Sequence, residues 1–372
     1  MKSRPAFIDT PQSLGTFCHE LAGSDWLAID TEFLRERTYR AQLCLIQVAN
    51  DTRIACIDPL AIADLSPLWE LLGDARSTKI LHAGYQDIEL VYQESGLIPT
   101  PVFDSQYAAG LLGLGEQMGY ARLVETLLGI ELDKSQSRTD WSARPLSADQ
   151  LTYAADDVRH LGTIYPRLRH ELEQAHRLTW LEEDMAALHR PERFTTNSEE
   201  AWRNVRGAGA LDPRGLAILQ GLAAWREQEA MHRDKPRGWI LRDEHLLKLC
   251  FLKPEDHHAL EAVPELSPGF LRRYADTVLA AIRAGLQLEE DALPPAIDTG
   301  PPSAEERAQI KTLQQRLREI ATQQSISAPL IANRAEIESL VRGRRDLRVL
   351  QGWRRQVAGE ALLALLADQP GS

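Results

Sequence analysis

The alternation of apolar and polar residues in the first half of the chain predicts strands mixed with helices. Short apolar or alternating runs, which are typical of strands, occur at 26–30, 41–49, 52–60 and 77–84. The first three runs are close enough together to form antiparallel neighbours. Helix-like stretches begin at Ser66 and at Tyr85. We therefore expect an α/β domain in which helices pack on a mixed sheet.

The clearest single helix of this half is predicted from Pro145 to about Ala175. Ser147 is followed three positions later by Gln150, the spacing of a capping box at a helix N-terminus. Pro166 lies inside the pattern and is expected to kink or interrupt the helix, because proline lacks the backbone N–H.

Strand patterns fade beyond about residue 200, and the remaining chain consists of amphipathic helical stretches. Four prolines in eleven positions mark a linker at 293–303. These patterns predict a domain over 1–200, a helical domain over 208–292, the linker, and a second helical domain over 304–372.

Composition points to a globular protein with several domains. The chain has 372 residues, of which 44% are apolar, and no run approaches the ~18 consecutive apolar residues of a membrane helix. No signal peptide is expected at the N-terminus. The four cysteines form no CxxC pair, so we interpret them as reduced thiols of a cytoplasmic protein.

The net charge of −12 is unevenly distributed. Residues 1–206 hold 20 basic and 31 acidic side chains, a net of −11, whereas residues 300–372 hold 11 and 8, a net of +3. An acidic front half is a poor non-specific binder of polyanions. Any contact with nucleic acid must therefore use local basic patches or bound cations.

Two acids stand at the end of the first predicted strand. Asp30 and Glu32 are two positions apart, so their side chains point to the same face of a strand. Adjacent carboxylates repel each other unless a positive group joins them. That group could be an arginine, a proton or a metal ion.

Further acids are placed to join this pair. Asp87 falls in the first turn of the helix after the strand 77–84, and such strand ends are common ligand sites in α/β folds. Tyr153 and Asp157 are four positions apart and share one face of the capped helix. Four carboxylates converging in one cleft suit hard divalent cations such as Mg²⁺ or Mn²⁺.

Three motifs carry a resemblance to a known superfamily. DTE (30–32), HAGYQD (82–87) and YAADD (153–157) resemble the three exonuclease motifs of the DEDD superfamily, which has a ribonuclease H-like fold. The third motif matches the tyrosine variant, because the position where the histidine variant needs His is Thr152.

A closer resemblance extends along nearly the whole chain. The stretches DTEFLRERTYRAQLCLIQVA and LDKSQSRTDWSARPL are similar to bacterial members of the ribonuclease D family. Residues 222–249 resemble the HRDC domain of that family well, and the residues after 303 resemble it more weakly.

This resemblance implies a 3′→5′ exoribonuclease that trims structured RNAs such as tRNA precursors and releases nucleoside 5′-monophosphates. Asp30, Glu32, Asp87 and Asp157 would then hold two divalent metal ions, Mg²⁺ or Mn²⁺. Tyr153 would hold the attacking water, since a tyrosine with a pKa of ~10 is a weak base at neutral pH. The helical domains would bind RNA.

Contacts to the substrate are less specifically indicated. In the polar loop before the capped helix, Trp141 is interpreted as stacking on a base, or Lys134 and Arg138 as contacting phosphate. The alternative is a loop packed on its own tryptophan. Phe33, beside the acidic pair, is interpreted either as a wedge against the terminal base or as a core residue.

A basic cluster near the C-terminus is interpreted as a phosphate-binding patch or, alternatively, as a solvated face. It consists of Arg342, Arg344, Arg345, Arg348, Arg354 and Arg355.

Two other functions stay open on the sequence alone. The same acids could serve a 3′→5′ exodeoxyribonuclease, because metal ions contact only the phosphate and discrimination rests on the 2′-hydroxyl. A nuclease-dead RNA-binding scaffold is the second alternative.

Overall fold

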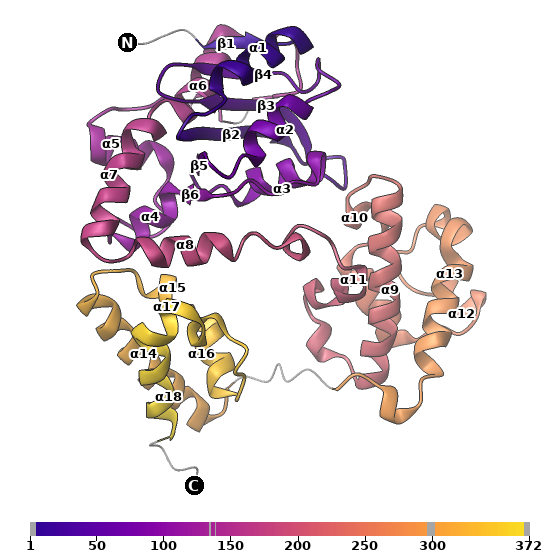
Figure 1. Ribbon diagram of the computed structural model, residues 1–372. Helices are drawn as coiled ribbons and strands as arrows, with labels where there is room; N and C mark the ends of the chain where they lie inside the picture. Colours follow the sequence, from indigo (N-terminus) through magenta and orange to yellow (C-terminus); the bar gives the residue numbers. More distant parts are fainter. Residues whose placement is uncertain (1–4, 134, 138, 296–301, 368–372) are drawn as a thin grey trace. The chain divides into compact units, whose positions relative to one another are not determined.

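The computed structural model describes residues 5–133, 135–137, 139–295 and 302–367 (Figure 1). The chain divides into two compact units. The first unit comprises the described parts of 1–34, 43–194 and 302–372, and the second comprises 35–42 and the described part of 195–301.

The first unit contains a mixed six-stranded sheet (Figure 1). Across the sheet the strands are β1 (Ala6–Ile8), β4 (Ile54–Ile57), β3 (Gln42–Ala49), β2 (Trp26–Leu34), β5 (Thr78–Leu81) and β6 (Val102–Asp104). β3 and β4 are antiparallel, whereas β2, β5 and β6 run parallel. The predicted α/β class and four predicted strands are confirmed. The short strands β1 and β6 escaped the prediction because three residues are too few to show an alternating pattern.

Helices pack against this sheet. α6 contacts β2 and β4, and α7 contacts β2 and β5. The helices between the N-terminus and residue 194 are α1 (Pro11–Leu21), α2 (Ser66–Gly73), α3 (Tyr85–Ser95), α4 (Ser105–Leu111), α5 (Tyr120–Leu128), α6 (Ala148–Arg159), α7 (Leu161–Gln174), α8 (Leu178–Ala186) and the short 3₁₀ helix η1 (Pro191–Arg193).

The helix predicted over 145–175 is in fact two helices. Its capping box is confirmed, since the Ser147 N–H donates to Gln150 Oε1 (2.9 Å) and the Gln150 N–H donates to Ser147 Oγ (3.1 Å). The interruption falls at His160 rather than at Pro166, which lies inside α7. At this break the Tyr120 hydroxyl donates to the Asp156 carbonyl (3.0 Å) and accepts the His160 N–H (3.3 Å). Tyr120 therefore satisfies backbone groups that the break exposes.

Gly162, which has no side chain, allows α7 to pack closely against β2. A Cβ built on Gly162 would lie 2.1 Å from the ring of Trp26, the first residue of β2. We expect Gly162→Ala to reduce the free energy of unfolding by roughly 1–3 kcal/mol, because the ring and helix must move apart. Urea denaturation measures this loss. Gly15→Ala in α1 is the control: its Cβ meets nothing within 4 Å, so equal destabilisation by both variants would contradict the packing argument.

The C-terminal helices belong to the first unit. They are α14 (Ala304–Gln323), α15 (Ala328–Ile331), α16 (Arg334–Val341), the 3₁₀ turn η5 (Arg348–Leu350), α17 (Gly352–Arg354), the π-helical turn η6 (Arg355–Gly359) and α18 (Glu360–Ala367). One hydrophobic cluster joins them to the sheet region, with Leu168 of α7 and Leu317 of α14 among its buried members. The rings of Trp180 and Trp353 stack with centroids 4.5 Å apart. The structure thus differs from the predicted separate domain over 304–372.

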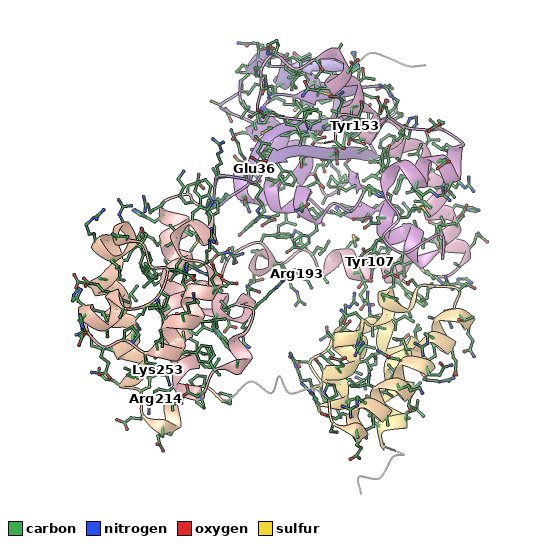
Figure 2. All side chains as sticks on the ribbon, turned by 180° about the vertical axis from the view of Figure 1, so that it is seen from behind. Glu36, Tyr107, Tyr153, Arg193, Arg214 and Lys253 are labelled. Carbon is green, nitrogen blue, oxygen red and sulfur yellow. The ribbon has the colours of Figure 1, made fainter. Side chains whose placement is uncertain are left out.

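A buried ion pair links α17 of the C-terminal helices to α8. Arg354 is only 3% exposed, and its guanidinium donates to Asp184 Oδ1 of α8 (2.6 Å) and to the Leu330 carbonyl (2.8 Å). Its Nη2 also donates to the hydroxyl of Tyr107, which projects from α4 (Figure 2). The interpretation of Arg354 as part of a phosphate-binding patch is therefore wrong, because this side chain is enclosed by protein.

The second unit is helical. Its elements are the 3₁₀ helices η2 (Ser198–Asn204), η3 (Ala208–Ala210) and η4 (Glu290–Ala292), and the helices α9 (Pro213–His232), α10 (Arg237–Ile240), α11 (Asp243–Leu252), α12 (His257–Glu261) and α13 (Pro268–Leu286). Its own core includes Leu222 of α9, Leu246 of α11 and Val278 of α13. The helical character predicted for 208–292 is confirmed.

Residues 35–42, which directly follow β2, pack with this second unit. The Tyr39 N–H donates to Asp234 Oδ1 (2.9 Å), and the Tyr39 hydroxyl donates to Glu227 of α9. The chain that leaves the strand bearing Asp30 and Glu32 is therefore held by the helical unit.

Among the residues that the structure describes, none of the helices combines the length and apolar character of a membrane span.

Candidate active site

The predicted acidic residues converge at the centre of the first unit. Asp30 and Glu32 lie on β2, and Tyr153 and Asp157 lie on α6, which packs on that strand (Figure 2 labels Tyr153). Carboxylate oxygens of Asp30, Glu32 and Asp157 all lie within 4.8 Å of one another. The tertiary structure therefore brings together acids that are more than a hundred residues apart in the chain.

Asp87 stands beside this trio rather than within it. It is the third residue of α3 and is 7% exposed, and its Oδ1 accepts a hydrogen bond from Thr31 Oγ1 (2.5 Å). Thr31 lies between the two acids of β2 and is itself buried. It thus ties Asp87 to the strand that carries Asp30 and Glu32, a role that its sequence position alone did not indicate.

The turn before α3 positions Asp87. Ala83 has φ = 55°, a left-handed conformation that costs energy for a residue with a Cβ. The Asp104 carboxylate accepts the N–H groups of Ala83 (3.2 Å) and Gly84 (2.9 Å) and so holds this turn. A Cβ on Gly84 would lie 2.5 Å from the Cβ of Leu81. Sequence reasoning missed Asp104, and only the helix-start signal of an aspartate before Ser105 hints at it.

Burial and mutual repulsion raise the pKa of all four carboxyl groups. Burial and the charges of the other three acids raise the pKa of Asp30 well above its usual value. Burial, followed by repulsion from Asp157 and Asp87, raises the pKa of Glu32 to about 8. Burial is also the main cause that raises the pKa of Asp157 to about 7 and that of Asp87 to about 6. The fully charged cluster is therefore unfavourable unless positive charge enters it.

Tyr153 is a hydrogen-bond donor in this site. Burial and the nearby carboxylates raise the pKa of its hydroxyl, which bonds to the Asp157 side chain. The phenol therefore stays protonated at neutral pH. Its ring lies against Trp141, with centroids 6.0 Å apart.

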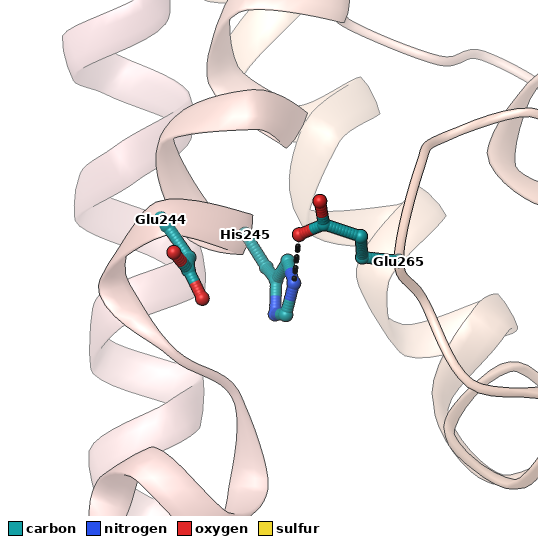
Figure 3. Close-up of side chains that lie close together, drawn as sticks. All are labelled: Glu244, His245 and Glu265. Carbon is teal, nitrogen blue, oxygen red and sulfur yellow. Dashed lines mark hydrogen bonds and ion pairs between the residues drawn. The ribbon is translucent and has the colours of Figure 1, made fainter.

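This donor set fits divalent cations that prefer oxygen ligands. The charges that act on Asp30 and Glu32 come from neighbouring carboxylates. Mg²⁺ and Mn²⁺ bind such groups of carboxylates in proteins and neutralise their negative charge. A second group of metal-ligating side chains, Glu244, His245 and Glu265, lies in the second unit (Figure 3). There Lys248 Nζ is 2.8 Å and His245 Nε2 is 3.3 Å from Glu265 Oε2. Because a lysine already balances Glu265, this second group is the poorer cation site.

The raised pKa values predict a pH-dependent stability. An acid with a higher pKa when folded contributes stability at low pH, and this is lost as the pH rises through the folded pKa. Without metal, we expect the thermal unfolding midpoint to fall by several degrees from about pH 5 to about pH 8, where Glu32 and Asp157 ionise. Added Mg²⁺ or Mn²⁺ should reverse this fall. A metal-free midpoint that stays level over this interval in scanning calorimetry would contradict the assignment of repelling carboxylates.

The residues predicted to contact substrate have different outcomes. Trp141 is only 2% exposed and packs in a small core with Cys44 and Ala154, so the prediction that it stacks on a base is wrong. Its loop is closed by an ion pair between Arg144 Nε and Asp58 Oδ2 (2.6 Å). Lys134 and Arg138 lie outside the described residues. Phe33 is half-buried on β2 directly after Glu32.

The C-terminal arginines are mostly engaged with acids. Arg344 is exposed and pairs with Asp346 (2.9 Å), whereas Arg345 is exposed and donates to the Leu340 carbonyl (3.0 Å). The other members are also paired: Arg342 with Glu306 (3.4 Å), Arg348 with Glu336 (3.0 Å) and Arg355 with Glu360 (3.5 Å). Such pairs lower the free charge that the cluster can offer to phosphate.

Comparisons with known proteins cover both units. The family model of 3′→5′ exonucleases matches residues 5–173, and the HRDC domain model matches residues 215–282. The first match contains the five residues predicted to be catalytic, and the second covers most of the helices of the second unit.

Relatives and solved structures are similar over nearly the full chain. Ribonuclease D of Acidiphilium cryptum is 38% identical over 97% of this chain and 93% of its own length, and that of Sphingobium indicum is 38% identical over 98% and 95%. The crystal structure of Escherichia coli RNase D, described as an exoribonuclease involved in structured RNA processing, matches with a TM-score of 0.91. It is 35% identical, covering 99% of this chain and 100% of that one. The catalytic core of RRP6 from Trypanosoma brucei shares the fold, at 20% identity and a TM-score of 0.59.

Proposed function

Because the chain belongs to the ribonuclease D family, we propose that it trims the 3′ ends of structured RNAs such as tRNA precursors, releasing nucleoside 5′-monophosphates. As a member of this family it is a 3′→5′ exoribonuclease, a hydrolase of phosphodiester bonds that depends on divalent metal. The observation that carries the proposal is the convergence of Asp30, Glu32 and Asp157 within 4.8 Å, with Asp87 tied beside them through Thr31.

We assign these four acids as ligands of two divalent cations, Mg²⁺ or Mn²⁺. When bound, such cations supply the positive charge that neutralises the scissile phosphate and activates water. The carboxylates hold that charge in place, and Asp104 and Thr31 keep Asp87 oriented toward it. The protein's part in this chemistry is positioning and charge neutralisation rather than covalent catalysis.

Tyr153 orients the attacking water. Its hydroxyl bonds to Asp157 and keeps its proton at neutral pH, since burial and neighbouring carboxylates raise its pKa. Because its one O–H proton is donated to Asp157, the phenol oxygen can accept a hydrogen bond from the water but cannot remove the water's proton. The water therefore loses its proton to another acceptor.

Three further side chains are proposed to contact RNA. Phe33, next to Glu32 on β2, would pack against the 3′-terminal base, because its ring is not fully enclosed. Arg344 and Arg345 are exposed and would contact phosphate after exchanging their present partners.

A cytoplasmic location is proposed as well. The cysteines Cys18, Cys56 and Cys250 are buried free thiols, as suits a reducing compartment.

The test follows a 5′-labelled tRNA precursor with a short 3′ extension, beside a single-stranded DNA of equal length, in Mg²⁺ or Mn²⁺. We expect a ladder of single-nucleotide steps from the RNA that EDTA abolishes. Equal or faster shortening of the DNA would shift the proposal to an exodeoxyribonuclease. Absence of cleavage of both would favour a binding protein.

A further inference from the structure

The short helix α10 presents an exposed tryptophan on the second unit. Residues 235–242, with the sequence KPRGWILR, join α9 to α11. Ile240 and Leu241 are 7% and 4% exposed and anchor the segment in the core, whereas Trp239 is 62% exposed. By contrast Trp202 of the same unit is buried. An indole left in solvent by a well-anchored segment is typical of a binding surface.

A hollow lies next to this tryptophan in the chain. Its volume is about 470 Å³, and it is lined by Asn204, Arg226, Arg237, Gly238, Arg242, Asp243 and Glu244. Three arginines against two acids leave it one net positive charge. Arg237 and Arg242 flank Trp239 in sequence, so cationic groups and an exposed aromatic ring occur on one short segment.

The arginines of the hollow can still donate hydrogen bonds to a bound anion. Arg226 is 4% exposed and donates through Nη1 to the Leu241 carbonyl (2.8 Å) and Asp243 Oδ1 (2.7 Å), but its buried Nε has no acceptor among the described residues. A buried donor without a partner is unfavourable. Arg242 is 72% exposed and lies 3.6 Å from Glu244, and Arg237 lies 3.5 Å from Glu227. The Arg242–Glu244 pair is long and exposed on both sides, so it is weak and exchanges readily, whereas Glu227 is buried.

Glu227 connects the hollow with the segment after β2. Its Oε2 lies 3.5 Å from Arg237 Nη1, and its Oε1 accepts the hydroxyl of Tyr39. Tyr39 belongs to residues 35–42, which continue from the strand with Asp30 and Glu32. The Glu227 carboxylate therefore contacts both Arg237 of the hollow and Tyr39 of the segment that follows β2.

We propose that this hollow and Trp239 bind single-stranded RNA: the arginines hold a phosphodiester and the indole stacks on a neighbouring base. The inference rests on the proposed function, since it identifies how the second unit takes the RNA substrate. Arg242 contributes an exchangeable phosphate contact, and Trp239 contributes stacking that tolerates any base.

Fluorescence anisotropy with the full chain tests this site. The probe is a labelled stem-loop RNA with a single-stranded 3′ tail, titrated in EDTA so that no cleavage occurs, at several salt concentrations. Trp239→Ala should weaken binding roughly 5- to 100-fold and leave the slope of log affinity against log salt unchanged. Arg242→Gln should weaken binding and reduce that slope by about one.

Matched variants of the same unit serve as controls. Phe251→Ala removes another exposed aromatic ring, 55% exposed on α11, and Arg273→Gln removes an exposed arginine of α13. Both should bind RNA like the unaltered protein. Thermal unfolding of each variant verifies that the fold persists.

The outcomes separate the two proposals. If the unaltered chain trims RNA but Trp239→Ala and Arg242→Gln bind as tightly as the controls, the hollow is no RNA site and the proposed function stands. If the unaltered chain trims no RNA, the proposed function fails, whatever the binding titrations report. Loss of binding in the two hollow variants alone supports the site.

Discussion

Asp157→Asn is expected to reduce the rate of RNA trimming by roughly 10³-fold or more, about 4 kcal/mol of transition-state stabilisation. Asn is nearly isosteric but carries no charge, so one of the three carboxylates that lie within 4.8 Å of one another no longer attracts a cation. Single-turnover trimming of a labelled RNA in Mg²⁺ measures this loss. RNA affinity in EDTA should stay within a factor of a few, since the helical unit is untouched.

The same variant should be more stable than the unaltered protein when metal is absent. Removing the Asp157 charge relieves repulsion with Glu32 and Asp30, whose raised pKa values report that repulsion. The adjacent Asp156→Asn is the control, because Asp156 pairs with Arg159 (2.6 Å) and is not among the three converging acids. Asp156→Asn should retain trimming. Persistent metal-dependent trimming by Asp157→Asn at the normal rate would overturn the site assignment.

Arg354→Met is expected to reduce the free energy of unfolding of the first unit by about 3–5 kcal/mol. The substitution keeps much of the side-chain volume but removes the side-chain donor of the Leu330 carbonyl and the positive partner of Asp184, which retains only neutral donors. Removing one partner of a buried pair leaves the other charge uncompensated, which is the costly case. Chemical denaturation followed by tryptophan fluorescence suits this test, because the stacked rings of Trp180 and Trp353 lie at the same contact.

Arg355→Met provides the control in the adjacent position. Arg355 is 59% exposed and lies 3.5 Å from Glu360, so its loss should cost less than about 1 kcal/mol. Adding Asp184→Asn to Arg354→Met should recover part of the stability, since the unpaired charge disappears. Equal effects of Arg354→Met and Arg355→Met would show that the buried pair does not fasten the C-terminal helices.

Much of the candidate site was accessible to sequence reasoning because its signals are local. A strand places Asp30 and Glu32 on one face, and a helix places Tyr153 and Asp157 on one face. These side-chain periods of strand and helix do not depend on where the element lies in the fold. The capping box of Ser147 and Gln150 likewise uses atoms within one turn. The resemblance to known exonuclease motifs then related these separate pairs to one another.

Other features depend on neighbours that are distant in sequence. Thr31 bonds Asp87, and Asp104 bonds the turn before it, through hydrogen bonds that exist only once β2, α3 and β6 are assembled. Trp141 is buried and cannot meet a base, although its polar surroundings in the sequence suggested exposure. In each case the local sequence pattern indicates which interactions a side chain can make, and tertiary packing determines which residues it contacts.

Apolar periodicity and short spacings in the sequence were enough to predict the class of fold, the acidic residues and the helical nature of the second half. Long-range packing, by contrast, places 35–42 with the helical unit, joins the C-terminal helices to the core of the sheet region and buries Arg354. An arginine's partner depends on which surfaces meet when apolar faces are buried. No local spacing in the sequence predicts that contact, because the residues that meet are up to 247 positions apart.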